Sequence, residues 1–167
     1  MANQDIYVVR DFLTEENREI VWNECLKQTL PTVRYTVEDD VSDIMQNAVG
    51  NFSKLHRQVL VFDEQEFSYN KLEERVYTDY QQDYVYFDGM TVIYFPMPES
   101  AYNFVHGGNV ELLVNGKVKT IKPMPNSLAL IDGSCWWRQT ALTTGTHYTY
   151  SIKYTKRNSR IYSNKQS

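Results

Sequence analysis

The stretch DGSCWWRQTALTTGTHYTYSIKY, residues 132–154, decides the fold predicted for this 167-residue chain. It holds two runs rich in aromatic and β-branched residues, WWRQTAL (136–142) and HYTYSIKY (147–154). A turn dipeptide that contains glycine stands before each run. Tyr148 and Tyr150 share one face of the second run, because side chains alternate along a strand. The stretch therefore predicts a pair of β-strands.

Five more short β runs precede this pair, and turn residues separate them. They are DYVYF (83–87), MTVIYF (90–95), VELLV (110–114), KVKTIKP (117–123) and SLALI (127–131). Asn115-Gly116 between VELLV and KVKTI predicts an antiparallel hairpin. Seven short strands after N-terminal helices predict an α+β protein, mainly β, with a double-sheet jelly roll braced by helices.

The N-terminal part alternates predicted strands and helices. Thr14 is the predicted N-cap of a helix over 15–30, with Glu15 and Glu16 in its first turn. The other expected elements are strands at 6–12 and 56–62, a short helix at 42–49 that ends at Gly50, and a helix near 67–81. We expect the helices at 15–30 and 67–81 to cover one sheet.

The composition indicates a globular, β-leaning protein, with 42% hydrophobic residues and 14% aromatic residues. We predict one jelly-roll domain over 1–167: helical and strand support at 1–82, a β core at 83–154, and a basic C-terminal arm at 155–167. Cys25 and Cys135 are expected to be buried thiols rather than a disulfide.

The start of the chain lacks the basic flank and apolar stretch of a signal peptide, and no apolar run is long enough for a membrane helix. We therefore expect a cytoplasmic protein, or part of a virus particle if a phage encodes it, with no membrane partner. The P-loop, GxGxxG, HExxH and GxSxG motifs are all missing from the sequence.

Four segments resemble the prolyl 4-hydroxylase-like branch of the 2-oxoglutarate/Fe(II) oxygenases. HGGNVEL (106–112) resembles that family's "GGEL" strand, and IKPMPNSLALIDG (121–133) its "v-P-x-x-G-x-l-v-l-F" segment. WRQTALTTGTHYTYSIKY (137–154) resembles its "H-x-V-x-P-V-x-x-G-x-R-y-s-l" ending, and YVVRDFLTEENREIVWNECL (7–26) its first strand and helix. The resemblance implies a double-stranded β-helix that covers most of the chain.

The family's ligand positions are altered in this sequence. Fe(II) in that family is held by two histidines and a carboxylate, and an arginine binds the cosubstrate. By the resemblance, the distal histidine falls on Trp137, whose indole has no lone pair for a metal, and the arginine falls on His147. The preceding H-x-D pair falls on Tyr86 and Asp88, which keep only the carboxylate.

Two other arrangements of the metal site stay open from the sequence. Placing the H-x-D pair at His106-Gly107-Gly108 keeps a histidine but loses the carboxylate and disrupts the "GGEL" match. Convergence of His56, His106 and His147 by another geometry would be a second arrangement. We therefore predict Tyr86, Asp88 and Trp137 as former metal positions, His147 as the former cosubstrate position, and no bound metal.

These substitutions predict a non-catalytic structural or binding module without a cofactor. Compact relatives of the family are common in bacterial and phage genomes, so a virion or assembly component fits this role. One alternative is an active hydroxylase with an altered iron site that uses Fe(II) and 2-oxoglutarate. A second alternative is a nucleic-acid-binding protein that uses the basic arm.

Charge is distributed unevenly along the chain. Residues 1–132 carry 11 Lys/Arg and 21 Asp/Glu, whereas residues 133–167 carry six Lys/Arg and no acid. We expect the arm to dock on an acidic surface of another protein subunit in an oligomer or larger assembly. The predicted partner-binding residues are Lys156, Arg157, Arg160 and Tyr162.

Overall fold

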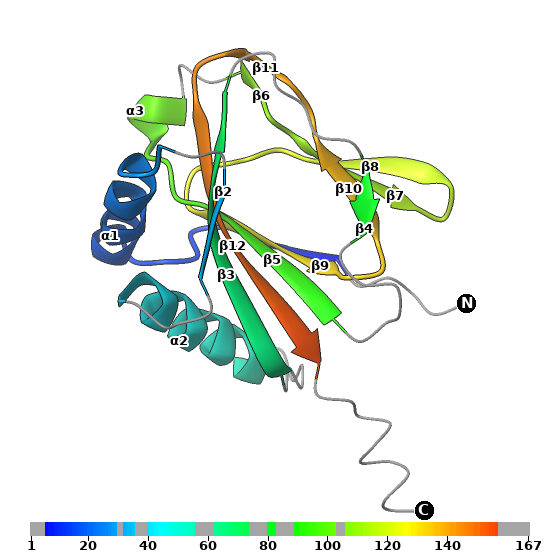
Figure 1. Cartoon of the computed structure of the whole chain (residues 1–167), viewed down its shortest axis with the longest axis horizontal. Coiled ribbons are helices and arrows are strands. Elements are labelled where there is room, and N and C mark those ends of the chain that lie inside the picture. Colours follow the sequence, from blue (N-terminus) through cyan, green and yellow to red (C-terminus); the bar gives the residue numbers. More distant parts are fainter. Residues whose placement is uncertain are drawn as a thin grey trace, which may run out of the picture.

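Two facing β-sheets and a layer of helices make up the fold (Figure 1). This computed structural model describes residues 6–29, 32–35, 40–55, 62–73, 80–82, 89–102 and 106–156. The α+β, mainly β jelly-roll class predicted from the sequence is confirmed. The division into one domain with a C-terminal arm stays a prediction.

The large sheet is antiparallel throughout. In spatial order, its strands are β1 (Ile6–Val9), β9 (Ser127–Asp132), β5 (Gly89–Phe95), β12 (His147–Lys156), β3 (Phe62–Leu72) and β2 (Thr32–Tyr35). The central position of β12 places the sequence after Gly145 between β5 and β3.

The small sheet contains, in spatial order, β4 (Gln81–Gln82), β10 (Trp136–Gln139), β7 (Val110–Val114) and β8 (Lys117–Ile121). The antiparallel β7–β8 hairpin turns at Asn115-Gly116, as predicted. Both turn residues have positive φ, 52° and 76°, which this type of two-residue turn requires. A separate pair, β6 (His106–Gly107) and β11 (Leu142–Thr144), links the ends of the two sheets.

Helices α1 (Glu15–Leu26) and α2 (Asp40–Leu55) cover the face of the large sheet that points away from the small sheet (Figure 1). The Thr14 side chain accepts a hydrogen bond from the Asn17 backbone N–H at 3.3 Å, which confirms the predicted N-cap. A one-turn helix, α3 (Glu99–Tyr102), follows β5. In the described segments, no helix is long and apolar enough to cross a lipid bilayer.

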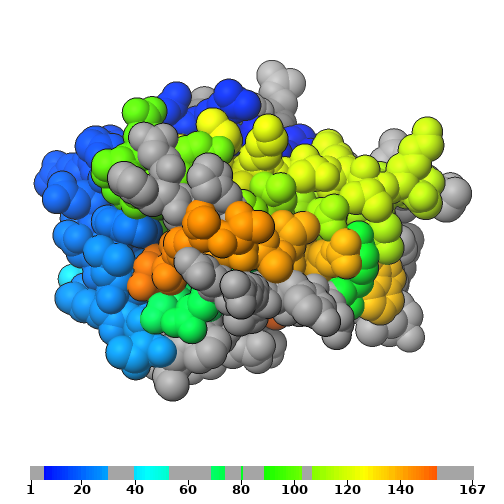
Figure 2. Space-filling view, turned by 90° about the horizontal axis from the view of Figure 1, so that it is seen from above, coloured from blue at the N-terminus to red at the C-terminus, as the bar shows by residue number. Residues whose placement is uncertain are grey.

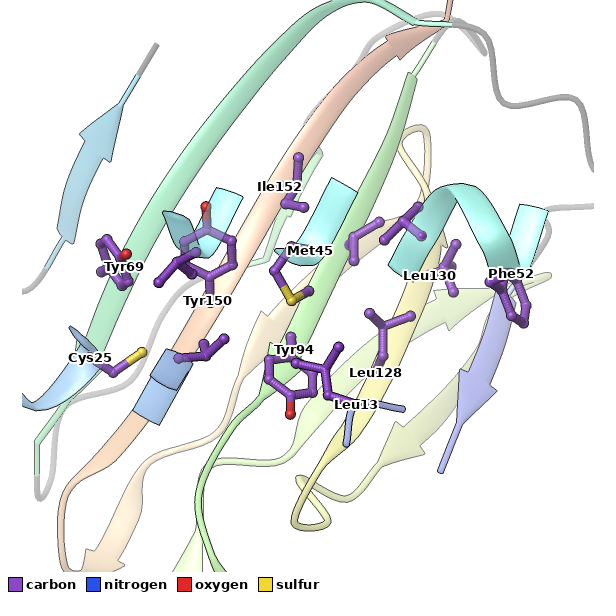
Figure 3. Packing of buried hydrophobic residues seen from close by; sticks show 14 of the residues in the cluster. Leu13, Cys25, Met45, Phe52, Tyr69, Tyr94, Leu128, Leu130, Tyr150 and Ile152 are labelled. Carbon is purple, nitrogen blue, oxygen red and sulfur yellow. The ribbon is translucent and has the colours of Figure 1, made fainter. Parts of the chain in front are cut away.

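The helix-covered core takes alternate residues from each central strand (Figure 3). From the sheet come Tyr69, Met90, Val92, Tyr94, Leu128, Leu130, Tyr150 and Ile152, and from the helices come Val21, Cys25, Val41, Met45, Val49 and Phe52. A second cluster fills the space between the sheets, from Ile93, Phe95, Ala129 and Ile131 on one side to Val110, Leu112 and Ile121 on the other.

The predicted helix at 67–81 is wrong, because β3 continues to Leu72. Its Glu and Lys content favours a helix, but backbone pairing with β12 along the strand outweighs that local preference. The helix predicted at 42–49 also ends too early, since α2 runs through Gly50 to Leu55. A helical glycine costs only about 1 kcal/mol, and the buried Val49 and Phe52 keep α2 against the sheet.

Two further elements differ from the prediction. The first helix ends at Leu26 rather than near residue 30. WWRQTAL does not form one strand, because β10 joins β7 in the small sheet whereas β11 pairs with β6. The strand predicted at 83–87 and most of the one predicted at 56–62 lie outside the described residues.

Candidate functional site

The inner face of the large sheet, which points toward the small sheet, carries a buried polar row on β12. Side chains alternate along this strand, so Tyr150 and Ile152 point to the helices while His147, Thr149 and Ser151 point inward. All three inward residues are at least nine-tenths buried. Hereafter the polar row denotes His147, Thr149 and Ser151. A buried polar row in the middle of a sheet is unusual and indicates a role beyond packing.

His147 begins β12 and is 1% exposed. Among the described residues, neither its Nδ1 nor its Nε2 has a hydrogen-bond partner. Its ring packs beside that of Phe95, with centroids 5.7 Å apart. Burial lowers the pKa of His147 to about 4, so the imidazole is neutral at neutral pH. A neutral imidazole offers one donor and one acceptor, and both are left available to a ligand.

The other members of the polar row have β3 as their neighbour. Thr149 pairs in register with Asn70, and the Asn70 Nδ2 donates a hydrogen bond of 2.9 Å to the Ser151 Oγ. On the opposite side of β12, the inward-facing Thr91 of β5 is 1% exposed. Hydroxyl and amide groups from three neighbouring strands therefore lie along the same inner face.

Two glycines allow β6 and β11 to close against His147. Gly107 has φ of 92°, and a Cβ there would lie 2.3 Å from the Ala141 carbonyl oxygen. A Cβ at Gly108 would lie 2.9 Å from the Leu142 Cδ2 and 3.5 Å from the His147 Cδ2. The glycine pair matched to the family's "GGEL" strand therefore permits a close approach of backbone to the imidazole.

The small sheet, which faces the large one, carries Trp137 on β10. This half-buried indole packs against the cluster between the sheets, which includes Leu112 and Phe95. The next residue, Arg138, lies on the other face of the strand, where its Nη2 is 2.7 Å from the Glu111 Oε1 and its guanidinium covers the Tyr80 ring at 4.5 Å. Trp137 thus points inward, toward the space between the sheets.

The structure describes only some of the predicted site residues. Tyr86, Asp88, His56, Arg157, Arg160 and Tyr162 lie outside the described residues, and Lys156 is the last residue of β12. The strand that pairs with β10 at Trp137 is β4, where Gln81 is the register partner. His106 is on β6, in register with Thr144 of β11.

Sequence reasoning missed Thr149 and Ser151 as candidate site residues. The signal was present, because the three members of the polar row alternate with Tyr148, Tyr150 and Ile152 in HYTYSIKY. Interpreting that alternation required knowledge that β12 is buried on both faces. Gln81 carries no comparable signal, since β4 is a two-residue strand.

The comparisons with known proteins indicate the same fold. No family model matches the sequence, and no curated protein is significantly similar to it. The structure is similar to a prolyl-4-hydroxylase from Pseudomonas putida, with a TM-score of 0.72 and 10% identity over 93% of this chain and 89% of that one.

Two further similar structures are also prolyl hydroxylases. One, from Trichoplax adhaerens, was solved with a hypoxia-inducible-factor peptide; its TM-score is 0.67, with 13% identity over 95% of this chain and 86% of that one. The other is the viral collagen prolyl hydroxylase of Paramecium Bursaria Chlorella virus-1 in its 2-oxoglutarate complex. Its TM-score is 0.64, with 13% identity over 90% of this chain and 96% of that one.

The prediction that no cofactor is used is contradicted by this comparison. The similar structures are prolyl hydroxylases and a protein of the 2-oxoglutarate/Fe(II) oxygenase family, and one of them holds 2-oxoglutarate. Proteins with this fold are thus associated with Fe(II) and 2-oxoglutarate rather than with the absence of any cofactor.

The described residues fit these two groups unequally. They include no cluster of three His, Cys, Asp or Glu side chains that could hold a metal, and the indole of Trp137 cannot be a ligand. They therefore do not fit Fe(II). His147 does fit a ligand oxygen, because its buried nitrogens have no partner in the described part of the chain.

The sequence motifs and the three-dimensional comparison agree on the architecture. The β7–β8 hairpin, helix α1 and the glycine pair before β7 occur where the sequence predicted them. At this level of identity the likeness shows the fold alone. This chain has the double-stranded β-helix fold of the prolyl 4-hydroxylase-like 2-oxoglutarate/Fe(II) oxygenases.

Proposed function

We propose that this protein is a binding module on an oxygenase scaffold, and that it binds a small dicarboxylate of the 2-oxoglutarate class at the polar row. The observation that carries the proposal is His147, which is buried and has no partner for either ring nitrogen among the described residues. A buried polar group without a hydrogen-bond partner destabilises the fold by about 1–3 kcal/mol. A ligand oxygen that hydrogen-bonds to the imidazole would offset this cost.

A carboxylate would interact with His147 in two ways. The neutral ring donates one hydrogen bond, and the negative charge of the ligand would raise the low pKa of the imidazole. Binding would then be accompanied by proton uptake and would be tighter at mildly acidic than at alkaline pH. A single imidazole lacks the two-pronged geometry of a guanidinium, so we expect weaker binding than an arginine would give.

The non-catalytic part of the proposal comes from Trp137 on the small sheet. Trp137 occupies the position that the motif resemblance assigns to a metal-binding histidine, and its indole packs into the cluster between the sheets. An indole at this position supplies apolar packing rather than a metal ligand. The competing proposal is an active oxygenase, and the structural similarity to prolyl hydroxylases supports it.

Calorimetric titration with 2-oxoglutarate, with and without Fe(II) under anaerobic conditions, tests the proposal. We expect saturable binding that His147→Phe weakens by about tenfold or more, since a hydrogen bond to a charged group contributes about 1.5–3 kcal/mol. His147→Gln keeps a donor but cannot titrate, so it should retain binding and lose the pH dependence. Tyr148→Phe, on the opposite face of β12, is the matched control.

Two results would overturn the proposal. If the wild-type protein shows no binding at millimolar 2-oxoglutarate, the proposed dicarboxylate ligand is wrong. Stoichiometric iron in the purified protein, together with succinate formation that chelation abolishes, would show a catalytic oxygenase instead of a binding module.

We further propose that the module acts within a protein assembly, such as a virus particle. Support comes from the charge asymmetry, with six basic and no acidic residues after Asp132. Truncation after Tyr154 should then weaken assembly at low and moderate salt. If the truncation removes only nucleic-acid binding, with a steep salt dependence, the arm serves nucleic acid instead.

A further inference from the structure

The outer face of the small sheet carries an exposed apolar row that runs across three strands. Trp136 of β10 pairs in register with Leu113 of β7, which pairs with Val118 of β8. Trp136 is 47% exposed and Val118 is 55% exposed, and both are among the large exposed apolar side chains. Directly paired side chains on one face lie within contact distance, so these three residues form one continuous surface, the apolar row.

The apolar row ends at an open sheet edge. Within the described ranges, β8 pairs with β7 on one side and with no strand on the other. Figure 2 shows the β7–β8 hairpin (yellow) projecting from the body of the molecule. An exposed edge strand presents unpaired backbone N–H and C=O groups that can pair with another extended chain.

The other face of β8 is basic. Ile121 packs between the sheets, so alternation places Lys117 and Lys119 on the inner side of the strand. Both lysines are nevertheless exposed, as is Lys122 just after the strand. Neither Lys117 nor Lys119 forms an ion pair with any described residue. The edge is therefore apolar on one side and positively charged on the other.

The apolar side and the basic side of β8 together indicate which kind of strand can bind at this edge. A second copy of β8 paired antiparallel to the first would bring lysines next to lysines, which is unfavourable. A strand whose residues alternate between acidic and apolar would place its carboxylates beside Lys117 and Lys119 and its apolar side chains beside Val118. We infer that the free edge of β8 binds an extended segment of a partner protein in which acidic and apolar residues alternate.

Lysines also protect edge strands from aggregation, which is the competing explanation for their presence here. Protection alone does not account for the apolar row, because exposed Val118 on the edge strand, with exposed Trp136 two strands away, would increase aggregation rather than prevent it. A partner strand at this edge would place an apolar side chain beside Val118, at the end of the row, and pair the backbone at the same time. The inference depends on the sheet edge and not on the proposed ligand at His147.

Fluorescence anisotropy of the full chain with a labelled, end-capped peptide that alternates glutamate and valine tests the inference. We expect saturable binding, about tenfold weaker in Lys119→Glu and in Val118→Gln. Lys27→Glu, at the C-cap of α1, carries the same change in charge at an exposed site away from β8 and should bind as the wild type does. The same peptide with alternate backbone nitrogens methylated should not bind, because methylation removes the donors of the added strand.

Four outcomes would overturn the inference. Lack of binding by the glutamate–valine peptide would leave the lysines with a protective role only. Equal binding by a lysine–valine peptide would remove the charge argument. Competition by a single-stranded oligonucleotide that depends on Lys119 would assign the edge to nucleic acid. Sedimentation that shows a dimer dissolved by Val118→Lys would assign it to a second copy of this chain.

Discussion

The two faces of the large sheet are formed by the same strands but differ in how their polar groups are satisfied. On the helix-covered face, the Tyr150 and Ser42 hydroxyls form a hydrogen bond of 2.7 Å, and the Tyr94 Oη donates to the Asn126 Oδ1 at 2.5 Å. On the inner face, His147 is as deeply buried as these tyrosines and has no partner in the described part of the chain.

This difference distinguishes the face that stabilises the fold from the face where we propose that a ligand binds. On the helix-covered face, apolar side chains pack together and the buried hydroxyls named above form hydrogen bonds, which is typical of a structural core. The buried imidazole contributes an unfavourable desolvation term and forms no compensating hydrogen bond among the described residues. Local violations of this kind are expected where a protein binds something, so the inner face is where we place the ligand.

The largest expected loss of stability comes from a substitution on the helix-covered face. Leu130→Ala removes a fully buried side chain from the cluster beneath α2 and should cost about 2–5 kcal/mol of unfolding free energy, measured by urea denaturation. Val118→Ala at an exposed position should change it by less than about 0.5 kcal/mol. Equal losses of unfolding free energy in Leu130→Ala and Val118→Ala would contradict the burial of Leu130 and the exposure of Val118.

Acid should destabilise the protein through the inner face. The pKa of His147 is about 4 in the folded protein and near 6.5 when unfolded, so the unfolded state binds the extra proton between these values. Stability is therefore fully present above about pH 6.5 and falls by about 3 kcal/mol as the pH approaches 4. The pH dependence of urea midpoints in wild type and His147→Phe isolates this contribution.

Other groups titrate in the same acidic range, so the difference between the two proteins is the decisive quantity. The Arg18 side chain lowers the pKa of Glu15 through a hydrogen bond, and both proteins share that pair. Parallel pH profiles for wild type and His147→Phe would show that His147 is protonated or partnered in the folded protein.

A smaller effect is expected for Tyr150→Phe. The change removes one partner of a buried hydrogen bond and leaves the Ser42 hydroxyl without it, so stability should fall by about 1–2 kcal/mol. Tyr148→Phe on the same face is half-buried and should have little effect. A calorimetric melting temperature for each variant checks this, and an unchanged Tyr150→Phe protein would argue against the hydrogen bond.

The smallest effect has the opposite sign. His147→Phe replaces a buried polar ring without a described partner by an apolar ring beside Phe95, so at mildly alkaline pH it should be neutral or stabilising by about 1 kcal/mol. Urea denaturation of the unliganded protein gives the value. A loss above about 2 kcal/mol would mean that the imidazole makes contacts that stabilise the fold.

Local sequence signals predicted several features correctly because their physical causes are local. Thr14 caps α1 through its own hydroxyl, and Asn115-Gly116 turns the β7–β8 hairpin by adopting positive φ. The failures have non-local causes. Residues 67–72 form a strand because β12 is available to pair with them, and that partner lies about eighty residues further along the chain.

The sequence by itself determined which side chains of HYTYSIKY share a face, because alternation along a strand is a property of the backbone. It also determined that Trp137 and His147 replace the residues that the motif resemblance expects. Only the tertiary structure decided which face the helices cover, and therefore that His147 is buried without a described partner. That choice depends on how β12 is placed between β3 and β5, which no local interaction specifies.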